Sequence, residues 1–188
     1  NRISIEALRL ISKSYIALKE FEIGYKYLEQ IIENYPNDIE TMKEIGNSFQ
    51  LSGQLEFAKR CYKHSIRLNS NYVPALTNLG AIELINKNME KAKALLLKAT
   101  KIDPNYSEGW GNLSNYFIQI NQLDKAEKAI RKTINLNPNC FNAYYILGTI
   151  LIKKNKLKEA EIMLKKSISI NPDFALSHSK LSTTLKDI

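Results

Sequence analysis

The chain has 188 residues, of which 44% are hydrophobic and 24% charged, and its formal net charge is +8. This composition is typical of a folded globular chain and excludes an intrinsically disordered one. No run of eighteen apolar residues is present, which argues against a transmembrane helix, and the first ten residues lack the apolar core of a signal peptide. Because the chain does not begin with Met, we expect it to be a trimmed fragment of a longer protein or a processed chain.

Two cysteines, Cys61 and Cys140, stand far apart without a C-x-x-C motif or a nearby pair of histidines. This spacing argues against a disulfide framework and against a zinc site. We expect ordinary reduced thiols, which fit a cytoplasmic protein, and we expect no metal or cofactor.

A spacing of 34 residues recurs along the whole chain. The columns that share it are Pro36, Pro104, Pro138 and Pro172; Gly46, Gly80 and Gly148; Ala58, Ala92, Ala126 and Ala160; and Leu79, Leu113, Leu147 and Leu181. The spacing divides the chain into the units 5–38, 39–72, 73–106, 107–140 and 141–174, followed by the half unit 175–188. Internal repeats of this length indicate stacked supersecondary units.

Each unit is predicted to form two amphipathic helices, because the apolar columns of each half follow steps of three, four and seven residues. Gly53, Asn121 and Asn155 share one column between the two helices, where a left-handed residue closes the first helix. The proline column ends the second helix, since proline disfavours the helical conformation of the residue before it. Small residues such as Gly80 and Ala92 are expected to let the two helices approach closely.

The pattern large-x-x-Leu-Gly-x-x-aromatic, then Ala-x-x-x-large-x-x-Ala and Pro, resembles the tetratricopeptide repeat (TPR) family. The resemblance covers nearly the whole chain, with seven columns in constant register. It implies an all-α fold, a right-handed α-solenoid formed by residues 1–188 as one array. The first helices of the pairs would line its concave surface and the second helices its convex surface. It further implies peptide or protein binding without catalysis.

The stretch "GWGNLS" (109–114) has the spacing of a dinucleotide-binding loop, but it follows a proline turn instead of a strand. Trp110 falls in a column of large residues that includes Leu8, Met42 and Leu76, so we expect it to be a packing residue in the core. No zinc-protease, nucleophile-elbow or phosphate-loop motif occurs, and we predict that the chain is not an enzyme.

A peptide-binding groove is predicted from the columns of the first helices that would face inward. Its candidate residues are Arg9, Lys13, Lys43, Asn47, Thr77, Asn78, Ala81, Gly111, Asn112, Asn115, Gln119, Tyr145, Thr149 and Lys153. An asparagine side chain offers a donor and an acceptor, so a row of asparagines could hold an extended backbone regardless of its sequence. The cations would favour an acidic ligand. The alternative is that asparagine is simply abundant, with 19 copies in the chain.

Two subtypes of the family match only in part. The carboxylate clamp of co-chaperones matches at Lys43, Asn47 and Asn78, but Glu108 and Asn112 stand where it needs cations. The asparagine ladder in the arm of O-linked N-acetylglucosamine transferase matches at Asn78 and Asn112. It fails at Glu44, Ile146 and Lys180. The repeats, "INPDFALSHSKL" (170–181) in particular, also resemble bacterial arrays fused to sulfo-, glycosyl- or methyltransferases.

Basic residues cluster on the second helices, and we expect them to form a solvated outer face. They are Arg60, Lys63, Arg67, Lys128, Arg131, Lys132, Lys165 and Lys166. Nucleic-acid binding is not expected, because acidic residues are interleaved and no RNA-binding motif is present.

The sequence therefore predicts a non-enzymatic, cytoplasmic scaffold that binds a protein or peptide, acidic by its cations, in a concave groove. One alternative is a substrate-recruiting arm of a larger transferase. Another is an array that self-associates through its C-terminal end, where Leu181 and Leu185 lack a covering helix.

Overall fold

The computed structural model describes residues 3–187, which form α-helices and turns and contain no strand. Residues 1, 2 and 188, at the limits of the predicted array, lie outside the described residues. The helices are α1 (Ile5–Ala17), α2 (Phe21–Asn34), α3 (Ile39–Leu51), α4 (Leu55–Leu68), α5 (Val73–Ile85), α6 (Met89–Ile102), α7 (Ser107–Gln119), α8 (Leu123–Leu136), α9 (Phe141–Lys153), α10 (Leu157–Ile170) and α11 (Ala175–Lys186). None of them, within the described range, is long and apolar enough to cross a bilayer.

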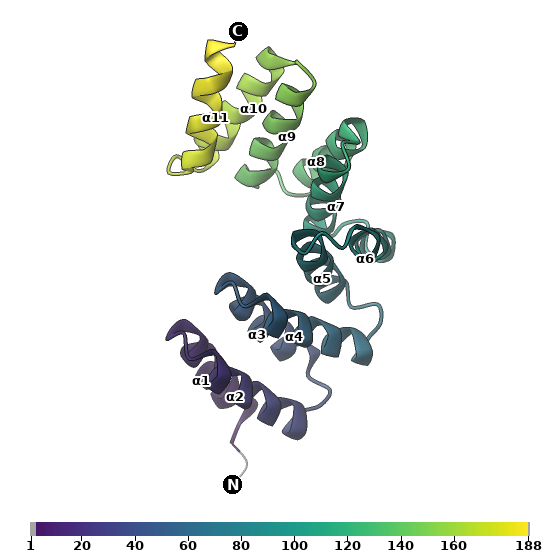
Figure 1. Cartoon of the computed structure of the whole chain (residues 1–188), viewed down its shortest axis with the longest axis vertical. Coiled ribbons are helices and arrows are strands. Elements are labelled where there is room, and N and C mark those ends of the chain that lie inside the picture. Colours follow the sequence, from purple (N-terminus) through teal and green to yellow (C-terminus); the bar gives the residue numbers. More distant parts are fainter. Residues whose placement is uncertain (1–2, 188) are drawn as a thin grey trace. The chain divides into compact units, whose positions relative to one another are not determined.

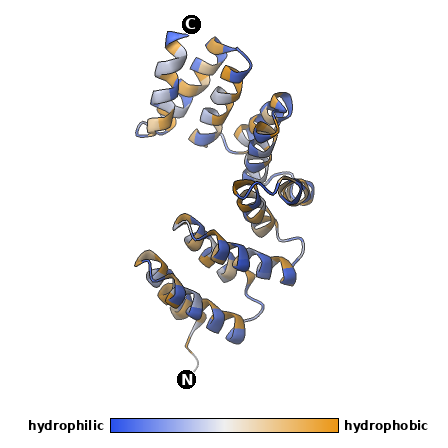
Figure 2. Ribbon diagram, in the orientation of Figure 1, coloured by the Kyte–Doolittle hydropathy of each residue, from blue (hydrophilic) through white to orange (hydrophobic). Residues whose placement is uncertain are grey.

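The helices fall into two compact units, unit 1 (Asn1–Asn88) and unit 2 (Met89–Ile188). In unit 1, α1 pairs with α2 and α3 with α4, and α5 packs on α4 (Figure 1). In unit 2, α7 pairs with α8 and α9 with α10, while α6 packs on α7 and α11 on α10. Most helices carry hydrophobic and hydrophilic residues on different faces, as amphipathic helices do, whereas α5 is apolar along most of its length (Figure 2).

The turn inside each hairpin uses one left-handed residue, as predicted. Gly53 has φ +76°, Asn121 +55° and Asn155 +58°. Two further members of the same column, Lys19 and Lys87, also have positive φ, at 65° and 61°. Closing the first helix demands this conformation in every hairpin, so the column keeps it even where the residue is a poor choice for it.

The second helices end where the proline column predicts, but proline is not required. α8 and α10 end at the residue before Asn137 and Asn171, whose φ angles of −138° and −132° are not helical. α4 ends at the same repeat position, Leu68, although the proline column holds Ser70 in this repeat. The side-chain oxygen of Asn69 accepts a hydrogen bond from the backbone N–H of Asn71 at 2.9 Å. This Asx turn competes with the helix and is sufficient to end it.

Small residues set the distance between the two helices of a hairpin, as predicted. A Cβ atom on Gly46 would lie 2.8 Å from a ring carbon of Tyr62, and one on Gly148 would lie 2.9 Å from Leu164. Where serine replaces glycine in this column, its hydroxyl is used. Ser114 donates to the backbone oxygen of Ala126 at 2.9 Å, and Ser12 does the same to Gly24 at 2.7 Å.

Trp110 is half-buried, so the prediction of a core residue is only partly correct. Its Nε1 donates to the backbone oxygen of Pro104 at 2.9 Å, which places the ring over the preceding turn. The buried residue at this end of α7 is Gly109. Its repeat counterparts Ala143 and Ser177 are also small and buried, and Ser177 contacts Ser167 of the preceding helix at 2.8 Å between hydroxyls.

The turn column generates a prediction about stability. Gly53→Ala should destabilise unit 1 by about 1 kcal/mol, because no atom lies near the new methyl group and only the positive φ penalises it. Lys19→Asn at the equivalent turn should stabilise, because asparagine tolerates the left-handed region better than lysine. Urea unfolding of the two variants measures both changes. Equal stability of Gly53→Ala and the wild type would contradict this account.

Candidate functional site

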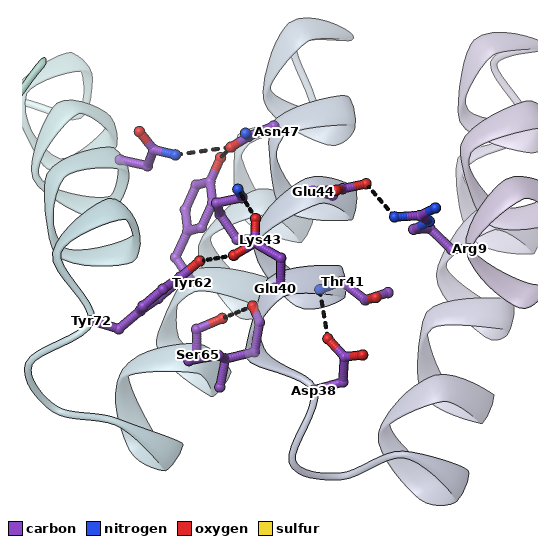
Figure 3. A network of polar contacts seen from close by, with 12 residues as sticks. Arg9, Asp38, Glu40, Thr41, Lys43, Glu44, Asn47, Tyr62, Ser65 and Tyr72 are labelled. Carbon is purple, nitrogen blue, oxygen red and sulfur yellow. Dashed lines mark hydrogen bonds and ion pairs between the residues drawn. The ribbon is translucent and has the colours of Figure 1, made fainter. Parts of the chain in front are cut away.

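The predicted asparagines of unit 1 meet in a cluster of amides. Asn78 of α5 donates from Nδ2 to Oδ1 of Asn47 on α3 at 2.8 Å. The phenol of Tyr62, from α4, lies 2.7 Å from the same Oδ1 (Figure 3). It also lies 2.9 Å from Oε1 of Gln50. Side chains from three helices thus meet at Asn47, and the fold brings them together.

Tyr62 is the buried base of this cluster. Its ring is fully buried and packs against Gly46, which leaves no space for a side chain at that position. Burial raises the pKa of the phenol, so the hydroxyl remains protonated and can act as a donor. A phenol has one proton, so at any moment it donates either to Asn47 or to Gln50.

The hydrogen bonds that Asn47 and Asn78 already make decide what remains for a ligand. Oδ1 of Asn47 accepts from Nδ2 of Asn78 and, whenever the phenol donates to it, from Tyr62 as well, and the two donors together occupy both of its lone pairs. Among the described residues, nothing pairs with Nδ2 of Asn47 or with Oδ1 of Asn78. Both residues are half-buried. The pair therefore presents one amide donor group and one amide acceptor side by side.

The predicted cations at the start of the groove are paired with acidic residues. Arg9 of α1 contacts Glu44 of α3 at 3.1 Å (Figure 3). Lys13 contacts the same carboxylate at 3.8 Å. Because Glu44 lies between the two cations, it offsets much of their attraction for an acidic ligand.

Lys43 is also neutralised locally. Its ammonium group pairs with Glu40 one turn earlier on α3, and the hydroxyl of Tyr72 donates to the same carboxylate (Figure 3). The hydrogen bonds from Lys43 and Tyr72 lower the pKa of Glu40, against a smaller opposing effect of burial. Burial, and then the carboxylate of Glu40, raise the pKa of Tyr72.

The prediction that Thr77 lines the groove is wrong. Its side chain is fully buried, so no ligand can reach it in this structure. Among the described residues its Oγ1 has no hydrogen-bond partner. The reason is the apolar character of α5, which buries residues on most of its faces, whereas a narrower stripe would have left position 77 at the surface. Ala81, one turn further, is half-buried as a groove residue would be.

In unit 2, α7 carries the remaining predicted amides. Asn112 and Asn115 are half-buried, and within residues 3–187 neither side chain has a hydrogen-bond partner. Gln119 is exposed and takes part in an interaction of its own. Gly111 is not demanded by packing, because an added Cβ would lie 3.7 Å from Oγ1 of Thr133, an ordinary contact. Gly111, Asn112 and Asn115 therefore remain available to a ligand.

The predicted residues of α9 are less uniform. Thr149 uses its hydroxyl on its own helix, where it donates to the backbone oxygen of Tyr145 at 3.0 Å. The ring of Tyr145 meets Phe174 edge-on at 5.4 Å between centroids, so it is partly occupied with packing. Lys153 is exposed. Of the predicted cations it stands apart, because no carboxylate in the described part of the chain pairs with it.

Several basic residues of the second helices have local partners. Arg131 pairs with Glu127 at 2.8 Å and Lys165 with Glu161 at 2.6 Å. The guanidinium of Arg60 lies over the ring of Tyr25, 5.4 Å from its centroid. These contacts agree with a solvated face in which charges of both signs are interleaved.

Sequence reasoning missed Tyr62, which organises the asparagine cluster. The signal was present, because Tyr62 stands in a column that otherwise holds Leu28, Leu96, Ile130 and Leu164. A single polar group in an apolar column indicates a partner for that group. Glu40 and Glu44 were missed as charge partners, because they pair with residues whose positions only the fold brings together.

The unpaired hydroxyl of Thr77 generates a prediction about stability. Thr77→Val keeps the shape of the side chain and removes the unpaired hydroxyl, so it should stabilise the protein by about 1 kcal/mol. Thermal or urea unfolding measures the change. A loss of stability would mean that the hydroxyl has a hydrogen-bond partner in the folded protein.

Glu40 gives a prediction about pH. Since its pKa is lower in the folded chain than in the unfolded chain, its contribution is present above the ordinary glutamate pKa. The contribution is lost as pH falls through the lowered value. At pH 7 the free energy of unfolding of the wild type should exceed that of Glu40→Gln by about 0.5 kcal/mol, which is typical of exposed ion pairs. Urea titrations across acidic pH should show the difference vanishing, and Tyr72→Phe should move that loss to higher pH. A difference independent of pH would refute it.

Comparison with models of known protein families identifies the family of this chain. The family model described as "Tetratricopeptide repeat protein 21 C-terminal ARM domain" matches residues 52–177, well over half of the chain, and the model "Tetratricopeptide repeat" matches residues 6–38. Comparison with curated protein sequences gives no match.

Solved structures share the fold at low identity. A crystal structure of MamA has a TM-score of 0.70 at 20% identity and covers 93% of this chain and 99% of its own. YrrB, described as "a TPR protein with an unusual peptide-binding site", has a TM-score of 0.64 at 19% identity, with coverages of 93% and 90%. TTC0263, a thermophilic TPR protein of Thermus thermophilus, has a TM-score of 0.76 at 15% identity, with coverages of 97% and 100%. With its eleven described helices in hairpin repeats, the chain belongs to the tetratricopeptide repeat family.

Proposed function

We propose that this protein is a non-enzymatic scaffold that binds an extended segment of a partner protein through the backbone of that segment. The observation that carries the proposal is the pair of amides Asn47 and Asn78, whose free donor and acceptor match the C=O and N–H of a peptide. Asn112 and Asn115 supply further amides of the same kind. YrrB supports the proposal, since it is a protein of the same fold that is described as having a peptide-binding site.

Charge is a weaker guide to the ligand than the amides are. The sequence favoured an acidic ligand, but Arg9, Lys13 and Lys43 all have carboxylate partners. A ligand gains little from cations that Glu40 and Glu44 already satisfy. Of the four proposed cations, only Lys153 adds an attraction for acidic residues. We therefore expect binding to depend mainly on hydrogen bonds to backbone groups and only weakly on salt.

Gly111 fits the same proposal. Helix packing would accept alanine there, and a glycine inside a helix costs about 1 kcal/mol relative to alanine. An unneeded glycine beside Asn112 leaves room for a ligand backbone to approach α7. We also propose a cytoplasmic location, which the two free cysteines support because thiols remain reduced in that compartment.

The proposal predicts that a library of random twelve-residue peptides displayed on phage will yield ligands for the wild-type chain. Asn78→Ala combined with Asn112→Ala should weaken the selected peptides at least tenfold, because each substitution removes hydrogen bonds to the backbone. Fluorescence anisotropy with synthetic peptides measures the dissociation constants. Raising the salt concentration from about 50 to about 200 mM should change them less than about threefold, as few free charges are involved.

A matched control replaces asparagines outside the groove. Asn69 and Asn137 each close a second helix and lie on turns, so Asn137→Asp, which keeps the Asx acceptor, should leave affinity unchanged. If the double variant binds the selected peptides as the wild type does, backbone capture by these asparagines is wrong.

A further inference from the structure

Resting on the proposed function, we propose that Tyr62 is a positioning residue that turns Asn47 and Asn78 into a directional clamp for one residue of the ligand backbone. The clamp accepts a residue with a backbone N–H and rejects proline. The clamp therefore restricts the sequence of the ligand at one position, on a surface that would otherwise bind any extended chain.

An asparagine amide without partners can present its oxygen or its nitrogen in either direction, since the terminal torsion is broad and roughly two-fold. Asn47 lacks this freedom. The phenol oxygen of Tyr62 lies 2.7 Å from Oδ1 and Nδ2 of Asn78 lies 2.8 Å from it. With Asn78 in its present orientation, turning the amide of Asn47 over would bring Nδ2 of Asn47 against Nδ2 of Asn78, so that two donors would face each other, and the phenol of Tyr62 would lose its acceptor on Asn47. The oxygen is held toward the protein, and the NH₂ group remains for the ligand.

Tyr62 can hold that orientation because it cannot move. Its side chain is fully buried, and its ring lies where a Cβ on Gly46 would come within 2.8 Å of it. Gln50 lies 2.9 Å from the phenol oxygen on the same helix as Asn47. Backbone, glycine and glutamine thus fix the position of one hydroxyl, and that hydroxyl fixes the amide of Asn47.

The polarity of the pair determines what binds. A ligand carbonyl accepts from Nδ2 of Asn47, and a ligand N–H donates to Oδ1 of Asn78. Reversing the chain would set the carbonyl against Oδ1 and the N–H against Nδ2, so one direction is preferred. A proline at this point would leave Oδ1 of Asn78 without a donor in a half-buried place, and a missing partner costs more than a hydrogen bond contributes.

Unit 2 shows what the same positions look like without the phenol. Asn115 is the repeat counterpart of Asn47, and Ile130 is the counterpart of Tyr62. Ile130 is fully buried and has no polar atom to offer, so nothing in the described part of the chain orients the amide of Asn115. The clamp therefore belongs to unit 1, while α7 provides amides that adapt to either direction.

The test uses the full chain and the peptides selected from the random phage library. Each selected peptide is synthesised with single backbone N-methyl groups, which remove one N–H at a time. We expect one position at which N-methylation weakens binding to the wild type about tenfold or more. The same methyl group should have little effect on Asn78→Ala, which lacks the acceptor. Tyr62→Phe should weaken the unmodified peptide about five- to tenfold and reduce the effect of the methyl group. The selected sequences should lack proline at that position.

Tyr25→Phe is the matched control, because Tyr25 lies in the same unit and its ring packs on Phe57 at 5.0 Å. It should leave affinity and methyl sensitivity unchanged. If Tyr62→Phe fails to fold by circular dichroism, Asn47→Ala replaces it and should give the same loss of coupling. A methyl effect that persists in Asn78→Ala, or full affinity in folded Tyr62→Phe, overturns the clamp while peptide binding stands. If no peptide is selected or bound, the proposed function fails and the clamp fails with it.

Discussion

The contact on which the structure depends is the close approach of the two helices in each hairpin. It occurs where a small residue of the first helix meets a larger residue of the second, as Gly46 meets Tyr62 and Gly148 meets Leu164. No side chain fits between them at this distance. The contact therefore fixes how far each helix can slide along its partner, and with it which residues of the first helix remain on the open face. Asn47 remains partly exposed because its neighbour Gly46 takes the position that contacts the second helix.

The regular part of the fold was predictable because it rests on columns of similar residues. Apolar columns with helical spacing predict the hairpins, and the Gly and Asn column predicts the left-handed turns at Gly53, Asn121 and Asn155. Lys19 escaped prediction because lysine does not favour positive φ and takes it only since its hairpin must close. Proline was an incomplete guide to helix ends, because Asn69 ends α4 with its own side chain.

The candidate site was less predictable, because its properties depend on pairs of residues from different helices. The sequence shows that Arg9 and Glu44 exist, but only the packing of α1 on α3 brings their charges within 3.1 Å. Thr77 lies in a column predicted to face the groove, yet the apolar surroundings of α5 bury it. Tyr62 was visible as an exception in an apolar column. Columns reveal what repeats share, and binding sites reside in what one repeat does differently.

Unit 1 contains a second exception of this kind. Glu83 stands in a column that holds Phe49 and Phe117, and it is 3% exposed. Its carboxylate is 3.3 Å from the ammonium of Lys59, and Asn88 donates to it at 2.6 Å. Breaking one member of such a buried group leaves the others uncompensated, so the group tolerates few arrangements.

The core of unit 2 differs from this arrangement. Ile130, Leu147 and Leu151 pack there without polar atoms in their side chains, and apolar side chains can repack when a neighbour changes. Unit 1 therefore contains buried polar groups at Tyr62 and Glu83, and the phenol of Tyr62 contacts the site residue Asn47. Unit 2 stabilises its helices without specifying the direction in which Asn112 and Asn115 point.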